Sequence, residues 1–130
     1  MLRECARVLR TGGLLAVVAI ECRPGLSAAD TERAGVLGPA DVQADAALVE
    51  MVTSVGLEAL RVVDWTDELR TVAKGTISAL ESRAGAIRRA EGDAVYEEEL
   101  GKKVRMVEGI DRGLLARTLV VARRGGPPPP

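Results

Sequence analysis

Residues 2–20 decide the fold, and they read Leu-Arg-Glu-Cys-Ala-Arg-Val-Leu-Arg-Thr-Gly-Gly-Leu-Leu-Ala-Val-Val-Ala-Ile. Apolar residues at the start of this stretch recur at the spacing of one helix face, namely at Leu2, Cys5, Ala6 and Leu9. Gly12 lies where the end of a helix favours a residue that tolerates a positive φ angle. The uninterrupted apolar run 14–20 then predicts a strand covered on both faces, as in a parallel α/β sheet.

This unit of helix, Gly-Gly turn and strand resembles one found late in the core of the class I S-adenosylmethionine-dependent methyltransferases. The family pattern is Leu-x-x-x-x-Arg-Val-Leu-x-x-Gly-Gly-x-Leu, matched here by Leu2, Arg7, Val8, Leu9, Gly12, Gly13 and Leu15. The family usually has Pro where Thr11 stands. In the family this unit lies past the middle of the domain, whereas here it starts at Met1. The resemblance therefore implies that the N-terminal half of the fold is missing.

Later segments extend the resemblance over residues 2–124. Residues 57–65 look like the sixth strand of the methyltransferases, which follows a helix ending in Gly, and residues 114–122 look like their terminal seventh strand. The helical residues 67–108 are similar to the segment that small-molecule methyltransferases place over the substrate. The resemblance thus implies an α/β fold with a partial Rossmann-like sheet of three strands, in which the last strand is antiparallel and central.

The residue pattern also predicts local features. Residues 26–38 lack clear periodicity and are interpreted as a loop, with a short helical turn within 28–33, and a helix is predicted from Pro39 to Gly56. Leu60 breaks the alternation of the strand 57–65. The apolar stripe 69–87 predicts a long helix in which a close packing contact explains Gly75, and Asp93 is expected to cap the next helix. Residues 125–130 are expected to be a disordered Pro-rich tail after a single methyltransferase-like domain, residues 1–124.

Composition excludes several classes of function. The 130 residues include 18 Lys and Arg against 19 Asp and Glu, one Trp, one Tyr and no Phe, which argues against nucleic-acid binding. The lack of histidine excludes Ser-His-Asp and Cys-His catalytic pairs and His-ligated zinc, and we expect no metal site. Cys5 and Cys22 form no CxxC pair, which favours reduced thiols in the cytoplasm. No apolar run approaches membrane-spanning length, and a cytoplasmic strand is favoured over a signal peptide at the N-terminus.

The resemblance implies S-adenosylmethionine as the cofactor. Binding it requires a Gly-rich turn after one strand and an acidic residue after the next, and the family supplies both from its N-terminal half. Nothing in this chain matches either feature, and Gly12-Gly13 precedes a strand rather than following one. We therefore name no cofactor-binding residue, leave the catalytic residues unknown, and expect the lone chain to be inactive and not to bind S-adenosylmethionine.

Ligands of open α/β sheets lie beyond the carboxyl ends of the strands, which selects four candidate substrate-binding residues. Glu21 and Cys22 follow the first strand, and Trp65 and Thr66 follow the second. Glu21 is interpreted as a base, as a ligand for a substrate amine, or as a solvated strand end. Trp65 suits a pocket wall or a core position, and Thr66 suits a helix cap better than a substrate contact.

Three functions remain open at this point. The favoured one is the C-terminal part of a small-molecule methyltransferase, and the alternatives are a non-catalytic α/β association module and an unrelated α+β ligand-binding domain. The favoured function requires the last strand to lie between the other two. It would leave the strand 14–20 with an unpaired apolar edge, which predicts a homo-oligomer or a partner that supplies the N-terminal half.

Overall fold

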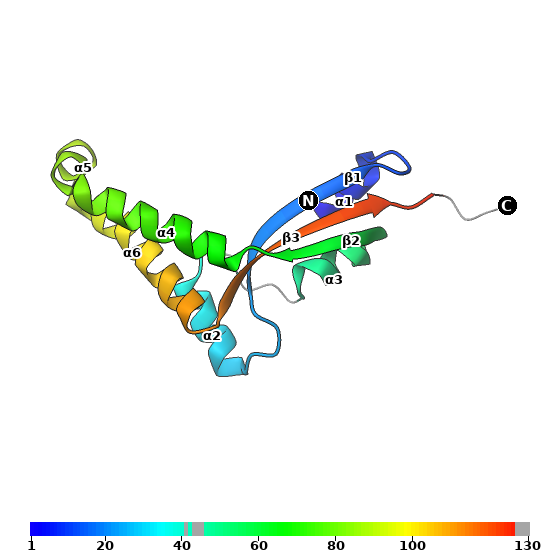
Figure 1. Ribbon diagram of the computed structural model, residues 1–130, viewed down its shortest axis with the longest axis horizontal. Helices are drawn as coiled ribbons and strands as arrows, with labels where there is room; N and C mark the ends of the chain where they lie inside the picture. The colour runs from blue at the N-terminus through cyan, green and yellow to red at the C-terminus, as the bar shows by residue number, and fades with distance from the viewer. Residues whose placement is uncertain (41, 43–45, 127–130) are drawn as a thin grey trace.

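The computed structural model describes residues 1–40, 42 and 46–126. The order of elements is α1 (Leu2–Val8), β1 (Leu14–Cys22), α2 (Ala28–Leu37), α3 (Leu48–Ser54), β2 (Leu57–Asp64), α4 (Thr66–Ser82), α5 (Ala84–Glu91), α6 (Asp93–Asp111) and β3 (Leu115–Arg124). Figure 1 shows the molecule as two parts, with the sheet, α1 and α3 at one end and a projecting bundle of α4, α5 and α6 at the other.

The three strands form one sheet in the order β1-β3-β2, with β3 antiparallel to both neighbours. Strands β1 and β2 are therefore parallel to each other without being paired. This confirms the predicted arrangement, in which the last strand is central. The pairing of β2 with β3 shifts register between Ala59 and Arg61. The predicted break in alternation at Leu60 is thus confirmed as a bulge-type irregularity.

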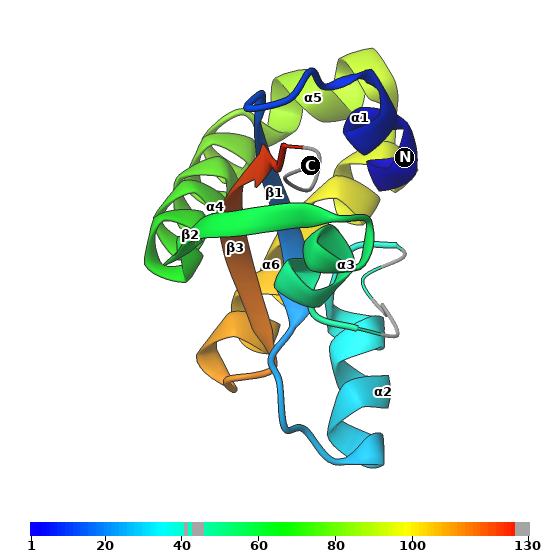
Figure 2. The ribbon, with the colours of Figure 1, turned by 90° about the vertical axis from the view of Figure 1, so that its right-hand side faces the viewer.

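One face of the sheet packs against α1 and α3, which Figure 2 shows on the same side of it. The predicted apolar stripe of α1 contributes Leu2, Ala6 and Leu9 to this contact, while Cys5 is only half-buried. Gly12 has the predicted positive φ of 75°, although α1 already ends at Val8. The centre of the resulting core consists of Leu48, Val52, Leu57, Val120 and Ala122.

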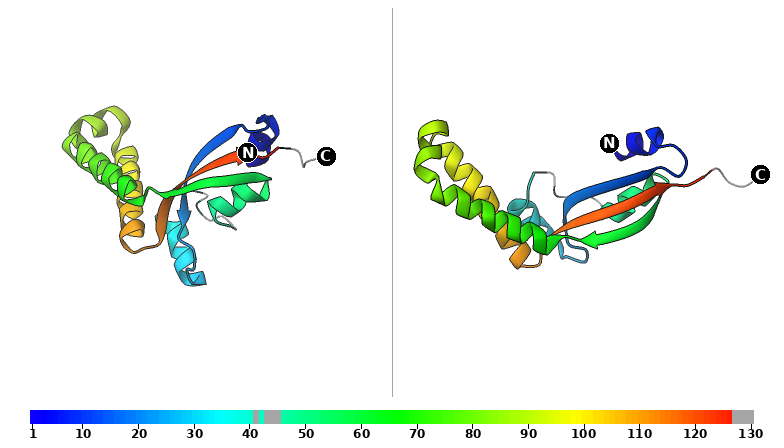
Figure 3. Two further views of the ribbon diagram at one scale, coloured as in Figure 1. Left: turned by 45° about the vertical axis from the view of Figure 1, so that its right-hand side comes forward. Right: turned by 45° about the horizontal axis from the view of Figure 1, so that its top comes forward.

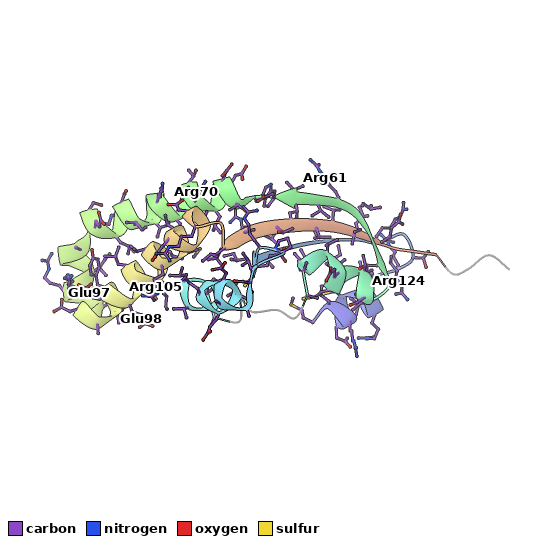
Figure 4. The ribbon with its side chains drawn as sticks, turned by 90° about the horizontal axis from the view of Figure 1, so that it is seen from below. Arg61, Arg70, Glu97, Glu98, Arg105 and Arg124 are labelled. Atoms are coloured by element: carbon purple, nitrogen blue, oxygen red, sulfur yellow. The ribbon has the colours of Figure 1, made fainter. Side chains whose placement is uncertain are left out.

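We call the opposite face of the sheet, which points away from α1 and α3, the outer face. Alternation along the paired strands places on it Leu14, Ala16, Val18, Arg61, Val63, Leu119 and Val121. Leu14 is 61% exposed and Val18 46%. Figure 4 shows Arg61 pointing away from α1 and α3. The prediction that β1 is covered on both faces is therefore wrong for residues 14–18, where Leu14 and Val18 are exposed, whereas Ile20, further along the same face, packs against buried residues.

The carboxyl ends of β1 and β2 meet a second core, formed with α2, α4 and α6. Its buried residues are Ala34, Leu37, Val42, Leu69, Met106, Ile110, Leu114 and Leu115. Leu115 is fully buried at its centre. Both views in Figure 3 show α4 and α6 running side by side away from the sheet. The predicted helical segment 67–108 thus projects beyond the strand ends where α/β folds bind ligands.

Two predicted boundaries in residues 26–56 are wrong. Residues 28–37 form the helix α2, not a loop, because the Ser27 hydroxyl accepts the Asp30 N–H at 3.1 Å and α2 buries Ala34 and Leu37 against the core. The next helix begins at Leu48 rather than at Pro39. This start depends on a contact with Glu21, which lies far from Leu48 in the sequence. Residues 41 and 43–45 of the predicted helix lie outside the described residues.

Three predictions in the helical segment need correction. The stripe 69–87 is divided between α4 and α5 at Arg83. Gly75 has open space around it, since beyond its own stretch of helix no atom lies within 4 Å of the position that a Cβ would take, so packing does not explain it. Asp93 is the first residue of α6 rather than its cap, and its carboxylate pairs with Arg88 at 3.0 Å. Residues 127–130 of the predicted tail lie outside the described residues.

Candidate functional site

Glu21 lies at the carboxyl end of β1, where its carboxylate is engaged on both oxygens. Oε2 accepts the backbone N–H of Leu48 at 2.7 Å, and Oε1 accepts the Thr118 hydroxyl at 3.1 Å. The first contact places a negative charge at the N-terminus of α3, where unsatisfied N–H groups favour it. Glu21 therefore joins β1, α3 and β3, a structural role that its position in sequence did not reveal.

Cys22 follows Glu21, and both line a cavity of about 250 Å³ at the end of β1. The cavity is completed by Leu26 and Thr31 on the α2 side and by Ala46, Ala47 and Glu50 around the start of α3. Burial, and secondarily the charge of Glu21, raises the pKa of the Cys22 thiol. The thiol therefore stays protonated at neutral pH and acts as a weak hydrogen-bond donor, 3.8 Å from the carbonyl oxygen of Val42, rather than as a nucleophile.

Thr66 begins α4 and is 3% exposed. Its hydroxyl donates to Asp64 Oδ1 and accepts the backbone N–H of Arg117 at 3.1 Å, and its own N–H donates to the same Asp64 oxygen at 2.9 Å. The capping carboxylate of α4 is thus Asp64, not the predicted Thr66. Sequence reasoning missed Asp64, although an Asp two residues before a helix is a recognisable capping signal.

Trp65 is half-buried, and the guanidinium of Arg117 lies over its ring, 5.8 Å from the centroid. The backbone N–H of Trp65 donates to the carbonyl oxygen of Arg117 at 2.7 Å. The two side chains are therefore held together where β2 ends and β3 begins. Arg117 was noted in the sequence only as a polar interruption of the last strand.

The structure divides the four predicted site residues into two pairs. Glu21 and Cys22 share the cavity at the end of β1, whereas Trp65 and Thr66 lie at the end of β2 and do not line it. A larger cavity of about 630 Å³ lies at the opposite, amino end of β1 and β2, beside Arg3, Arg7 and Arg124. It is remote from the strand ends where ligands of α/β sheets bind, so we assign it no part in the site.

The carboxylates of Glu21 and Asp64, at the described strand ends, already have partners. The ribose hydroxyls of S-adenosylmethionine need a free carboxylate at such a position. Glu21 is occupied by Leu48 and Thr118, and Asp64 by Thr66 and, at 3.5 Å, by Arg23. The described part of the chain also contains no group of three or more potential metal-ligating side chains. None of its helices is long and apolar enough to cross a membrane.

No family model and no curated protein matches the sequence. The comparison with known proteins therefore rests on solved structures. A protein assigned as a sarcosine dimethylglycine methyltransferase from Galdieria sulphuraria matches 95% of this chain with a TM-score of 0.81 at 19% identity. The chain therefore shares its fold with about half of that methyltransferase structure. This confirms the predicted resemblance at the level of fold.

Two further matches agree with that assignment. Phosphoethanolamine N-methyltransferase 2 of Haemonchus contortus, in complex with phosphomonomethylethanolamine and S-adenosylhomocysteine, matches 96% of this chain with a TM-score of 0.79 at 10% identity. A mycolic acid cyclopropane synthase complexed with S-adenosylhomocysteine matches 95% with a TM-score of 0.75 at 15% identity. This chain covers 46%, 29% and 48% of the three matched chains, and so spans about half of their length or less.

Another match shows that the fold does not determine the reaction. A [4+2]-cyclase matches 97% of this chain with a TM-score of 0.65 at 21% identity. The same architecture therefore carries different chemistries, and function has to be argued from the site.

Proposed function

We propose that this chain is the acceptor-side, C-terminal part of an S-adenosylmethionine-dependent methyltransferase that acts on a small molecule in the cytoplasm. The observation that carries the proposal is the combination of the β1-β3-β2 order with a helical bundle projecting beyond the carboxyl ends of β1 and β2. Free Cys5 and Cys22 support the location, since reduced thiols are typical of cytoplasmic proteins. No catalytic step is assigned to a residue of this chain.

The proposal places the cofactor in a further part of the fold. The carboxylates of Glu21 and Asp64 already have partners, so the lone chain is expected to be inactive. Strand β1 pairs only with β3 among the described strands, and its other side borders an apolar cavity of about 460 Å³ lined by Leu2, Val17, Val18, Met51 and Val55, among others. We assign this edge to a strand of the cofactor-binding, N-terminal half, carried on the same polypeptide or on a partner chain.

The acceptor is expected at the carboxyl ends of β1 and β2, beneath the α4–α6 bundle. The cavity beside Glu21 and Cys22 lies at the end of β1, and Leu26 and Thr31 line its side next to α2. Methyl transfer requires positioning of the acceptor and exclusion of water more than it requires a strong base. A projecting bundle of helices suits both tasks, which is why residues 67–108 are proposed as the substrate cap.

The first test concerns the cofactor. The coding DNA on the 5′ side of Met1 and the neighbouring genes are read for a strand, Gly-rich turn and helix followed by an acidic strand end. The chain is then produced with and without that part. We expect calorimetry to detect S-adenosylmethionine binding, and labelled methyl transfer to small acceptors, only when both parts are present. Micromolar binding by the lone chain would refute the division of roles.

The second test concerns the β1 edge. Unpaired backbone groups cost about 1–3 kcal/mol each when buried, so the edge requires a partner or exposure to water. We expect light scattering to show self-association of the isolated chain. The N-terminal half should replace this self-association and slow amide hydrogen exchange at Val18, whose N–H points away from β3, whereas Val17 N–H already faces β3. A stable monomer whose Val18 amide exchanges fast, with or without that half, would contradict the proposal.

A further inference from the structure

Arg117 occupies a boundary on the outer face of the sheet. It is paired in register with Ile20 and lies on the same face as Leu115 and Leu119, two positions away on either side. Leu115 is fully buried in the core beneath α2, α4 and α6, whereas Leu119 is half-buried beside the open part of the face, near exposed Val18. The Arg117 side chain thus lies where the helical part of the molecule meets uncovered sheet.

The guanidinium of Arg117 differs from those of the other half-buried arginines that the structure describes. Arg23, Arg70 and Arg88 each pair with a carboxylate, and Arg124 donates to the backbone carbonyl oxygens of Arg7 and Leu9. Within the described part of the chain, Arg117 has no carboxylate within 4.0 Å and its side chain makes no hydrogen bond. Its charge therefore has no partner among the described residues.

One atom of this group is both buried and unpaired. Nε of Arg117 is inaccessible to water and has no hydrogen-bond partner among the described residues. Leaving a buried donor unsatisfied is costly, and the cost is larger for a charged group. The face of the Trp65 ring, 5.8 Å from the guanidinium carbon, offsets this only in part. A ligand cannot reach Nε, but it can reach the terminal nitrogens Nη1 and Nη2, which are not fully buried, and so supply the counter-charge that the guanidinium lacks in the described part of the chain.

We propose that Arg117 and Trp65 form a recognition site for an oxyanion group, a carboxylate or a phosphate, carried by the methyl acceptor. The planar fork of a guanidinium binds such a group through two parallel hydrogen bonds, and the indole ring would pack against the apolar part of the same molecule. The inference that this ligand is the methyl acceptor rests on the proposed function. The inference that the site binds an oxyanion does not rest on it, since anion binding requires no cofactor.

Trp65 supplies the readout, because it is the one tryptophan of the sequence. The full chain is titrated with sodium acetate, and separately with sodium phosphate, at constant ionic strength while its tryptophan fluorescence is followed. We expect a saturable change with at least one of the two anions, and the tighter one indicates whether the group is a carboxylate or a phosphate. Arg117→Gln should weaken the apparent affinity about tenfold or more, as expected for loss of a charge-assisted bond.

The matched control is Arg61→Gln. Arg61 is exposed on the outer face of the neighbouring strand, without a carboxylate partner among the described residues, so it tests for general attraction of anions. Its variant should respond like the parent chain. A change that does not saturate, or that Arg61→Gln and Arg117→Gln alter equally, would mean screening by an adventitious ion only and would overturn the site.

A stability measurement separates recognition from packing. Arg117→Met keeps an unbranched apolar stem and removes the unpaired Nε, so the urea midpoint of the variant should equal or exceed that of the parent chain. A lowered midpoint together with no anion response in the parent would assign Arg117 a packing role and overturn the proposal. If the anion response were lost when the N-terminal half is added, a carboxylate side chain of that half would be the partner of Arg117. This result would also overturn the proposal.

The two proposals fail separately. Absence of anion binding would leave the cofactor test untouched, because that test follows S-adenosylmethionine. Conversely, saturable anion binding at Arg117 with no methyl transfer by the two-part assembly would support the site and refute the proposed function.

Discussion

The carboxylate of Glu21, at the end of β1, accepts the backbone N–H of Leu48 at 2.7 Å and so caps α3 from 27 residues away. The residue before α3, Ala47, has no side chain that could do this, and no local side-chain cap is present. The first turn of α3 therefore depends on a residue of another element. This contact explains both the position of α3 on the sheet and the late start of that helix.

Replacement of Glu21 should consequently destabilise the fold. Glu21→Ala leaves the Leu48 N–H without its partner in a half-buried setting, and we expect a loss of about 1–3 kcal/mol in the free energy of unfolding. Glu21→Gln keeps an acceptor for Leu48 and should lose less. Urea denaturation measures both. The control is Glu50→Gln, which changes an exposed residue of α3. A Glu21→Ala variant as stable as this control would contradict the capping role.

Thr66 offers a second test of a buried polar contact. Its hydroxyl accepts the backbone N–H of Arg117 and donates to Asp64. Thr66→Val keeps the shape but leaves that N–H unsatisfied beside a residue that is 3% exposed, which should cost about 1–3 kcal/mol. Thr66→Ser keeps the hydroxyl and should lose clearly less stability. Equal losses in the two variants would show that the methyl group, not the hydroxyl, matters at this position.

The glycines at 75 and 109 should respond in opposite directions to replacement by Ala. A Cβ at Gly109 would lie 2.5 Å from Cδ1 of the fully buried Leu115 and 3.3 Å from Cβ of Leu37. Overpacking of this kind costs about 1–3 kcal/mol. Gly75 has free space and lies inside α4, so Gly75→Ala should stabilise by up to about 1 kcal/mol. Thermal unfolding of the two variants gives the sign of each effect, and a stabilised Gly109→Ala would contradict the described packing.

Asp64 should make stability depend on pH in the acid range. Hydrogen bonds from the hydroxyl and then the N–H of Thr66, with help from Arg23, hold the pKa of Asp64 below its ordinary value. Because folding lowers this pKa, its contribution is complete above the unfolded value of about 4 and is lost as the pH falls through the folded value. Urea midpoints at neutral and acid pH should therefore differ less in Asp64→Asn than in the parent chain. An unchanged difference would contradict this role of Asp64.

Local pattern predicted the elements whose signals lie within them. The apolar run after Gly12-Gly13 forms β1, Leu60 interrupts β2, and the long stripes of residues 66–111 form helices. These succeed because strand and helix periodicities are properties of neighbouring residues. The family resemblance added the order of the strands, which periodicity alone does not contain.

The errors at α2 and α3 share one physical cause, which is that a remote group decided a local structure. The start of α3 depends on Glu21, and the burial of α2 depends on a core completed by α6 and β3. The reason for Gly109 is Leu115, which reaches it across the turn between α6 and β3, whereas Gly75, which looked like a packing position, has open space. No window of sequence contains both partners of the contact between Glu21 and Leu48.

The same distinction between local and remote causes applies to the candidate site. Residue type and position after a strand predicted Glu21, Cys22, Trp65 and Thr66, because strand order and direction place such residues at one edge of an α/β sheet, and their contact with a substrate stays a prediction. Tertiary structure alone decided their roles: it bound Glu21 to α3 and β3, bound Thr66 to Arg117, and placed an unpaired guanidinium over Trp65. The reason is that a side chain's role depends on which hydrogen-bond partners lie within reach, and most of these partners come from elements far away in the chain.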